Sequence, residues 1–157
     1  MACLEKLERY LHEHRVPYRV ERHRAAFTAQ EIATAEHVPG RRFAKVVMAH
    51  ADGELIMLTL PAPYLVDTDL LSTVVGKTAR LAEEAEFAPR FPDCEPGAMP
   101  AFGNLYGIPV LVEADLATGD PIVMQAGDHR VTVELAYRDW ERLVRPTVAH
   151  FSHPSSG

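Results

Sequence analysis

The alternation of apolar and polar positions along the chain predicts several short helices and strands. Leu4, Leu7 and Leu11 recur at helical spacing, so residues 1–14 should form an amphipathic helix with its polar side in solvent. Period-two alternation and short apolar runs predict strands over residues 18–21, 43–50, 54–60, 78–81, 110–113, 122–125 and 131–135. The helical period predicts further helices over residues 70–75, 83–87 and 137–143.

Local signals at the ends of these segments support the predicted order. The run from Thr28 to Glu31 is a capping box, in which the threonine and glutamate side chains each accept a hydrogen bond from a free backbone N–H at a helix start. Asp52-Gly53 is typical of a type I′ turn between antiparallel strands. Asp67 and Gly76 supply the N-cap and the stop of one helix. Because helices and hairpins follow without regular alternation, the pattern favours an α+β fold, a single domain with a mixed β-sheet and flanking helices.

Composition limits the size of the domain and the class of its partners. The 157 residues, 47% hydrophobic and 24% charged, fit one domain, which we expect over residues 1–146, with residues 147–157 as a loosely held tail. A net charge of −6 argues against DNA coating, although a local basic patch remains compatible with RNA, and its expected members are Arg22, Arg24, Arg41, Arg42 and Lys77. No apolar stretch is long enough for a bilayer and no signal-peptide pattern is present, so we expect no membrane partner and a cytoplasmic location.

Two common kinds of catalytic centre lack their sequence signatures. The eight histidines show no metal-site spacing, and we expect neither a metal nor a cofactor. No Gly-x-Ser-x-Gly turn presents a nucleophilic serine. Cys3 and Cys94 are too few for a disulfide scaffold, and we interpret them as reduced thiols.

One charged residue, Lys45, interrupts a run that otherwise has the composition of a buried strand, Phe43 to Met48. Neither face of this strand is polar enough to be typical of a solvent-facing surface. An ammonium buried without a partner costs on the order of several kcal/mol. Two interpretations stay open: the side chain reaches solvent or a carboxylate at the sheet edge, or it binds an anionic group and takes part in catalysis.

Two glycine-bearing segments complete the candidate chemistry. Gly97 to Gly103 has a glycine at each end, where backbone can approach a ligand, and it lies in a Pro- and Gly-rich region, residues 89–109, that is too long for a plain connection. Ala126 to His129 links two predicted strands and should place its histidine at a sheet end. Each segment alone is ordinary turn chemistry, but together with Lys45 they describe a pocket.

The order and spacing of these segments resemble the YbaK and prolyl-tRNA-synthetase-associated domain family, the trans-editing aminoacyl-tRNA deacylases. The resemblance covers nearly the whole chain. It rests on residues 28–31, Lys45, and residues 52–53, 60–62, 66–67, 97–103, 107–110, 126–129 and 139–143.

The resemblance implies a pocket that accepts the aminoacylated 3′ acceptor end of a mischarged tRNA and needs no metal, cofactor or side-chain nucleophile. It implies a catalytic role for Lys45. The residues that it places at the substrate are Thr28, Gly97, Ala98, Met99, Pro100, Ala101, Gly127 and His129. The family loop has proline at its fifth position, where this chain has Ala101, and a polar residue often follows the lysine, where this chain has Val46. The accepted amino acid therefore does not carry over.

We expect, on this basis, an aminoacyl-tRNA deacylase, a hydrolase of ester bonds that supports translation fidelity, with a synthetase as a further candidate partner. Two alternatives stay open: a catalytically silent module that binds tRNA or a synthetase, and a hydrolase of a small ester unrelated to tRNA. Residual deacylation of mischarged tRNA would separate the first from an enzyme, and competition by uncharged tRNA would separate the second.

Overall fold

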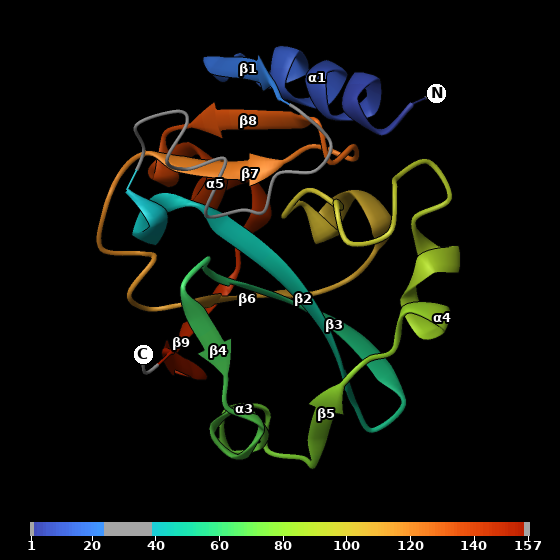
Figure 1. Cartoon of the computed structure of the whole chain (residues 1–157), viewed down its shortest axis with the longest axis vertical. Coiled ribbons are helices and arrows are strands. Elements are labelled where there is room, and N and C mark those ends of the chain that lie inside the picture. Colours follow the sequence, from blue (N-terminus) through green and yellow to red (C-terminus); the bar gives the residue numbers. More distant parts are fainter. Residues whose placement is uncertain (1, 24–38, 156–157) are drawn as a thin grey trace.

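The computed structural model describes residues 2–23 and 39–155 of the chain (Figure 1). The strands are β1 (Tyr18–Arg22), β2 (Ala44–Ala51), β3 (Glu54–Pro61), β4 (Tyr64–Val66), β5 (Ala79–Leu81), β6 (Val110–Glu113), β7 (Ile122–Gln125), β8 (Val131–Leu135), β9 (Thr147–Ala149) and β10 (Ser152–Pro154). The α-helices are α1 (Cys3–Glu13), α3 (Thr68–Val75), α4 (Glu84–Phe87) and α5 (Tyr137–Val144), and the 3₁₀ turns are η1 (Gly40–Arg42), η2 (Ala88–Arg90) and η3 (Gly103–Tyr106).

The strands form one mixed sheet and two antiparallel ones, which confirms the predicted α+β class. The mixed sheet has the order β5-β2-β3-β6-β9, with β3, β6 and β9 parallel to one another. A three-stranded antiparallel sheet has the order β1-β8-β7, and β4 pairs with β10. An isolated parallel bridge between Phe43 and Val123 joins the first two sheets just before β2 begins.

The hairpin of β2 and β3 has the predicted turn. The two strands pair without interruption from Ala44 opposite Pro61 to Ala51 opposite Glu54. Asp52 and Gly53 have φ values of 56° and 81°, and positive φ at both central positions is what a type I′ turn requires. The turn therefore sets the register that fixes which face of β2 each side chain occupies.

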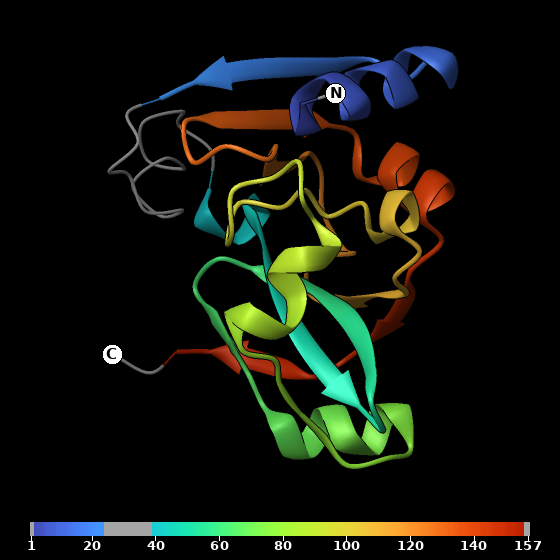
Figure 2. The ribbon, with the colours of Figure 1, turned by 90° about the vertical axis from the view of Figure 1, so that its right-hand side faces the viewer.

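Each face of this hairpin covers a separate hydrophobic core. On one face, Leu7 and Leu11 of α1 are fully buried in a cluster that includes Met124 of β7 and Trp140 of α5. On the other face, Leu58 packs in a second cluster with residues of α3 and β4. Figure 1 shows α1, β1 and β8 at one end of the molecule and α3 with β5 at the opposite end, and Figure 2 shows the same separation after a quarter turn.

Local signals correctly predicted the ends of α3. The Asp67 carboxylate accepts hydrogen bonds from the backbone N–H groups of Asp69 and Leu70, at 3.0 and 3.1 Å. Gly76 has a φ of 73° and ends the helix. Across the described residues, no helix combines the length and the apolar character needed to cross a membrane.

The C-terminal residues differ from the sequence prediction, because residues 147–154 are not a loosely held tail. β9 is the edge strand beside β6, and β10 pairs with β4. Phe151, between these two strands, is fully buried in the second core cluster. A buried aromatic side chain thus helps to fix a segment whose composition is mostly polar.

The carboxylate of Glu113 fixes the same segment from inside. This side chain is fully buried at the end of β6. Its Oε1 accepts hydrogen bonds from the backbone N–H groups of Phe151 and Ser152 and from the Ser152 hydroxyl, at 3.1, 3.0 and 2.7 Å. Its Oε2 contacts His150 Nδ1 at 2.8 Å and accepts from the Asp115 N–H at 3.1 Å. The buried charge is therefore stabilised by the chain that it anchors.

The interpretation of the two cysteines as reduced thiols was wrong. Cys3 and Cys94 form a disulfide across a sequence separation of 91 residues. Their Cα atoms lie 5.3 Å apart, within the usual range for such a bond. The bond ties the first residue of α1 to the loop that precedes Gly97.

Candidate functional site

Lys45 lies in the middle of the hairpin with its side chain half-buried. Ala44 and Val46 pack in the cluster that contains Met124, and side chains alternate along a strand, so the lysine leaves the opposite face of β2. Burial lowers the pKa of Lys45 below its ordinary value. Among residues 2–23 and 39–155, no carboxylate lies within 4.0 Å of its ammonium. The partly desolvated charge can therefore accept an anionic group.

Polar side chains of the three-stranded sheet share the face from which Lys45 projects. Phe43 and Val123 form the parallel bridge, and Lys45 and Gln125 each follow two residues later, so both side chains leave the same face. Thr132 of β8 stands opposite Gln125 in the antiparallel register and is 1% exposed. The sheet thus places an amide and a buried hydroxyl on the side of the lysine.

The Gly97 loop, which we define as residues 97–103, is mostly inside the protein. Gly97 is exposed, with a φ of 84°, whereas residues 98–103 are buried. The carbonyl of Ala98 accepts from Gly127 N–H at 2.7 Å, and the carbonyl of Ala101 accepts from the Trp140 indole N–H at 2.7 Å. Two N–H groups of the loop donate to thioether sulfurs: Gly97 to Met99 Sδ and Ala101 to Met124 Sδ, at 3.3 and 3.4 Å. The buried part of the loop is therefore fixed, and its exposed end is Gly97.

The turn between β7 and β8 contacts this exposed end. His129 Nε2 lies 3.0 Å from the Pro96 carbonyl, which can only accept, so this nitrogen carries a proton. Nδ1 lies 3.5 Å from the amide nitrogen of Gln125. A Cβ built on Gly97 would lie 3.6 Å from His129 Cε1, so the imidazole lies beside this glycine. Gly127 has a φ of 94°, a conformation that favours glycine.

The structure thus brings some predicted residues together and separates others. Gly97, Gly127 and His129 lie together, and Gln125, which lies beside His129, leaves the same face as Lys45 two residues after the Phe43–Val123 bridge. The predicted side chains of Met99 and Ala101 pack in the core cluster instead of lining a cavity, and Ala98 and Pro100 are also buried. The predicted contact residue Thr28 lies outside the described residues.

Sequence reasoning missed Gln125 and Thr132. Gln125 ends an otherwise apolar strand and lies two residues before Gly127, which is a signal that could have been used. Thr132 gives no such signal, because threonine is common in strands. Only the register of β7 and β8 shows that these two side chains are neighbours.

The predicted basic residues that the structure describes do not form one patch, and Arg24 lies outside the described residues. Arg42 donates to the backbone carbonyls of Leu116, Gly119 and Pro121 at 2.9, 2.6 and 2.8 Å, so it holds a loop. Arg22 and Arg41 are exposed near the three-stranded sheet and η1. Lys77 follows α3, at the end of the molecule remote from β1 (Figure 1). Arg22 and Arg41 are thus the exposed cations of this group near the candidate site.

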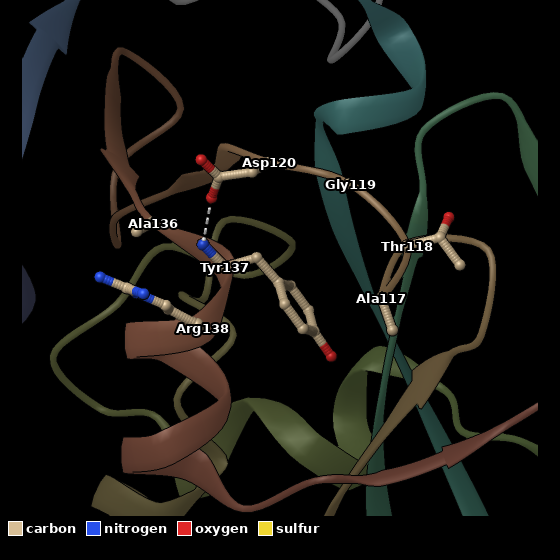
Figure 3. A pocket seen from close by; sticks show the side chains of 7 residues that line it. All are labelled: Ala117, Thr118, Gly119, Asp120, Ala136, Tyr137 and Arg138. Carbon is tan, nitrogen blue, oxygen red and sulfur yellow. Dashed lines mark hydrogen bonds between the residues drawn. The ribbon is translucent and has the colours of Figure 1, made fainter.

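A cavity of about 540 Å³ beside α5 contains none of the predicted site residues. It is lined by Ala117, Thr118, Gly119, Asp120, Ala136, Tyr137 and Arg138 (Figure 3). The Asp120 carboxylate already accepts the first backbone N–H of α5, that of Tyr137, at 2.7 Å. This carboxylate occupies the anion-binding position of the helix start. The hollow is therefore a weaker candidate than the region around Gly97.

Comparisons with known proteins agree with the fold. Residues 23–143 match the aminoacyl-tRNA editing domain family. No curated protein matches the sequence. A solved structure of a hypothetical protein is 18% identical, with 94% of this chain and 99% of that chain covered and a TM-score of 0.84. A candidate trans-editing enzyme for prolyl-tRNA synthetase is 17% identical, with 98% of each chain covered and a TM-score of 0.84. A scaffold from the computational design of epitope presentation is 15% identical, with 99% of each chain covered and a TM-score of 0.85.

Proposed function

The chain belongs to the aminoacyl-tRNA editing domain family, and we propose that it hydrolyses the ester bond of a mischarged aminoacyl-tRNA. The reaction proceeds without a metal, in a pocket formed by Lys45 and the exposed end of the Gly97 loop. The acceptor end of the tRNA is the substrate, and the cytoplasm, where charged tRNA is used, is the proposed location. A synthetase that delivers the tRNA is a proposed partner.

The observation that carries the proposal is the half-buried ammonium of Lys45, which has no carboxylate within ion-pair distance in the described part of the chain. A tRNA acceptor end brings phosphate groups, and a developing oxyanion adds a further negative charge at the scissile ester. A cation held in a partly desolvated place interacts with such charges more strongly than one in water. Lys45 is therefore proposed to hold the terminal nucleotide or the reacting carboxyl group.

The exposed end of the loop supports the same chemistry. The N–H of Gly97 donates to the thioether of Met99, which is a weak acceptor. An ester oxygen or an oxyanion is a stronger acceptor, so the N–H can exchange its partner at small cost when substrate binds. His129 lies beside Gly97 and donates to the Pro96 carbonyl, which fixes the position of this donor. An aminoacyl ester is already activated, so a positioned water and such a donor are sufficient without a covalent intermediate.

A deacylation assay over a panel of mischarged tRNAs tests the proposal. The parent should release the amino acid from at least one member, and Lys45→Met should lower kcat/KM by about 100-fold, as expected when a charge at the reacting group is removed. The melting temperature should stay the same or rise slightly, since a methionine of similar shape removes a desolvated charge. Lys77→Met, an exposed lysine at the remote end, is the matched control and should behave as the parent.

Three results would contradict the proposal in different ways. Unchanged turnover with a lower melting temperature for Lys45→Met would make this lysine structural. Binding of tRNA without release of any amino acid would favour a silent tRNA-binding module. Hydrolysis of small esters that uncharged tRNA does not inhibit would favour an esterase unrelated to tRNA.

A further inference from the structure

The disulfide joins two parts of the chain that meet beside the proposed site. Cys3 begins α1 and is 3% exposed, whereas Cys94 is half-buried and lies three residues before Gly97. Both residues line a cavity of about 720 Å³ between the start of α1, residues 92–96 and the turn at residues 126–128. A small thiol reagent can therefore approach Cys94 from this cavity.

The backbone of Gly127 lies directly on the disulfide. A Cβ at this glycine would collide with Cβ and Sγ of Cys3. The N–H of Gly127 donates to the Ala98 carbonyl at 2.7 Å, and its own carbonyl accepts from the Glu95 N–H at 2.8 Å. The disulfide, the turn at residues 126–128 and the start of the Gly97 loop are thus one packed unit. A change at the sulfurs must therefore alter the position of the loop.

A hydroxyl, a cation and a carboxylate surround the two sulfurs. The Tyr106 hydroxyl lies 3.5 Å from Cys3 Sγ and 3.2 Å from Cys94 Sγ. The Lys6 ammonium lies 3.9 Å from the centroid of the Tyr106 ring. The Lys6 cation favours a thiolate, which is the leaving group when a disulfide is opened. The Asp93 carboxylate, which accepts from the Tyr106 hydroxyl at 3.1 Å and lies 3.6 Å from Cys94 Sγ, disfavours a thiolate on Cys94, so Cys3 is the better leaving group.

We infer that Cys3 and Cys94 are a redox-active pair that regulates the deacylase site through the Gly97 loop. The co-reactant is a dithiol reductant. One of its thiolates attacks Cys94 Sγ, the bond between the cysteines breaks, and Cys3 leaves as a thiolate that takes up a proton. The second thiol of the reductant then attacks the mixed disulfide and releases Cys94, so the reductant leaves as a disulfide and two electrons reduce the pair.

The direction of regulation follows from the packing. With the bond closed, Cys3 and Gly127 hold the start of the loop in place, whereas with the bond open residues 92–97 can move away from α1. The oxidised protein should therefore be the more active deacylase. The inference rests on the proposed function, because charged tRNA places the protein in a reducing compartment, where a disulfide is usually transient and redox-sensing.

The test uses the full chain after oxidation and after treatment with dithiothreitol. Alkylation and mass spectrometry should find both cysteines blocked in the first sample and both alkylated in the second. Reduction should lower kcat/KM by about fivefold, since the loop is less well positioned, and reoxidation should restore it. The double variant Cys3→Ser/Cys94→Ser should have the kcat/KM of the reduced parent, and dithiothreitol should not change it.

Backbone hydrogen exchange keeps this inference separate from the proposed function. The N–H groups of Glu95 and Gly127 should exchange about tenfold faster after reduction, because the packed unit opens more often. If no mischarged tRNA is hydrolysed, faster exchange still supports a redox device, and unchanged exchange overturns it. Two alkylatable thiols in the oxidised sample, or equal activity in both redox states, would also overturn it.

Discussion

The contact between Trp140 and the Gly97 loop gives a sharp test of how the loop is held. The indole N–H donates to the Ala101 carbonyl at 2.7 Å, and both residues are fully buried. Trp140→Phe keeps an aromatic ring in the same core but removes the donor. Because no water reaches the carbonyl, the loop must either leave it unsatisfied or move to find another partner.

The expected loss of stability can be worked from this contact. An unsatisfied buried carbonyl costs about 1 to 3 kcal/mol. The smaller ring leaves a void that adds about 1 kcal/mol. For a chain of 157 residues, with an unfolding entropy of roughly 0.33 kcal/mol per kelvin, the two effects lower the melting temperature by roughly 6 to 12 °C. A loop displaced by a fraction of an ångström should also lower kcat/KM by about tenfold.

Thermal unfolding and deacylation should be measured together, with Tyr137→Phe as the control. This second variant lies on the same helix and removes the hydrogen bond from the Tyr137 hydroxyl to Glu141, at 2.7 Å, without touching the loop. It should cost about 1 kcal/mol and leave kcat/KM unchanged. If Trp140→Phe loses stability but keeps the activity and substrate ranking of the control, the indole supports the core alone and the positioning argument fails.

The remaining predictions concern the loop sequence, the basic residues and the lysine. Ala101→Pro removes the N–H bond to the Met124 thioether and should change the ranking of accepted amino acids more than the melting temperature; an unchanged ranking would mean that the loop does not select the substrate. Arg41→Glu should weaken tRNA binding and reduce the salt dependence of log K by about 0.7 per lost contact, whereas Lys77→Glu should not; equal effects would exclude a local patch. The pKa of Lys45 in the folded protein lies below 10.5, the value in the unfolded chain. At pH values between the folded pKa and 10.5, the unfolded chain binds more protons than the folded protein. The free energy of unfolding should therefore rise with pH in this range in the parent but not in Lys45→Met.

Much of the fold could be predicted because its signals are local. The positive φ values at Asp52 and Gly53, the cap at Asp67 and the short apolar runs of β6, β7 and β8 depend on neighbours within a few residues. The spacing of the apolar positions and the residue types of the turns therefore identified these elements at nearly their observed bounds. The fold class followed from their irregular order.

The disulfide and the C-terminal strands could not be predicted in the same way. The partners Cys3 and Cys94 are 91 residues apart, and the spacing of two cysteines says nothing of their distance in space. β10 pairs with β4 because the buried carboxylate of Glu113 accepts three hydrogen bonds from Phe151 and Ser152. Long-range contacts of this kind override a polar composition that is typical of a loose tail.

The loop shows why the departure from the family pattern need not loosen the site. Proline at the fifth position would restrict the backbone through its own ring. In this chain Ala101 occupies that position, and the restraint comes from outside: the indole of Trp140 binds its carbonyl, and Gly127 binds the carbonyl of Ala98. A restraint made by neighbouring elements can be changed at those elements, by reduction of the disulfide beneath Gly127 or by substitution in α5. The rigidity of the loop is thus a property of the folded chain, and a sequence motif alone does not contain it.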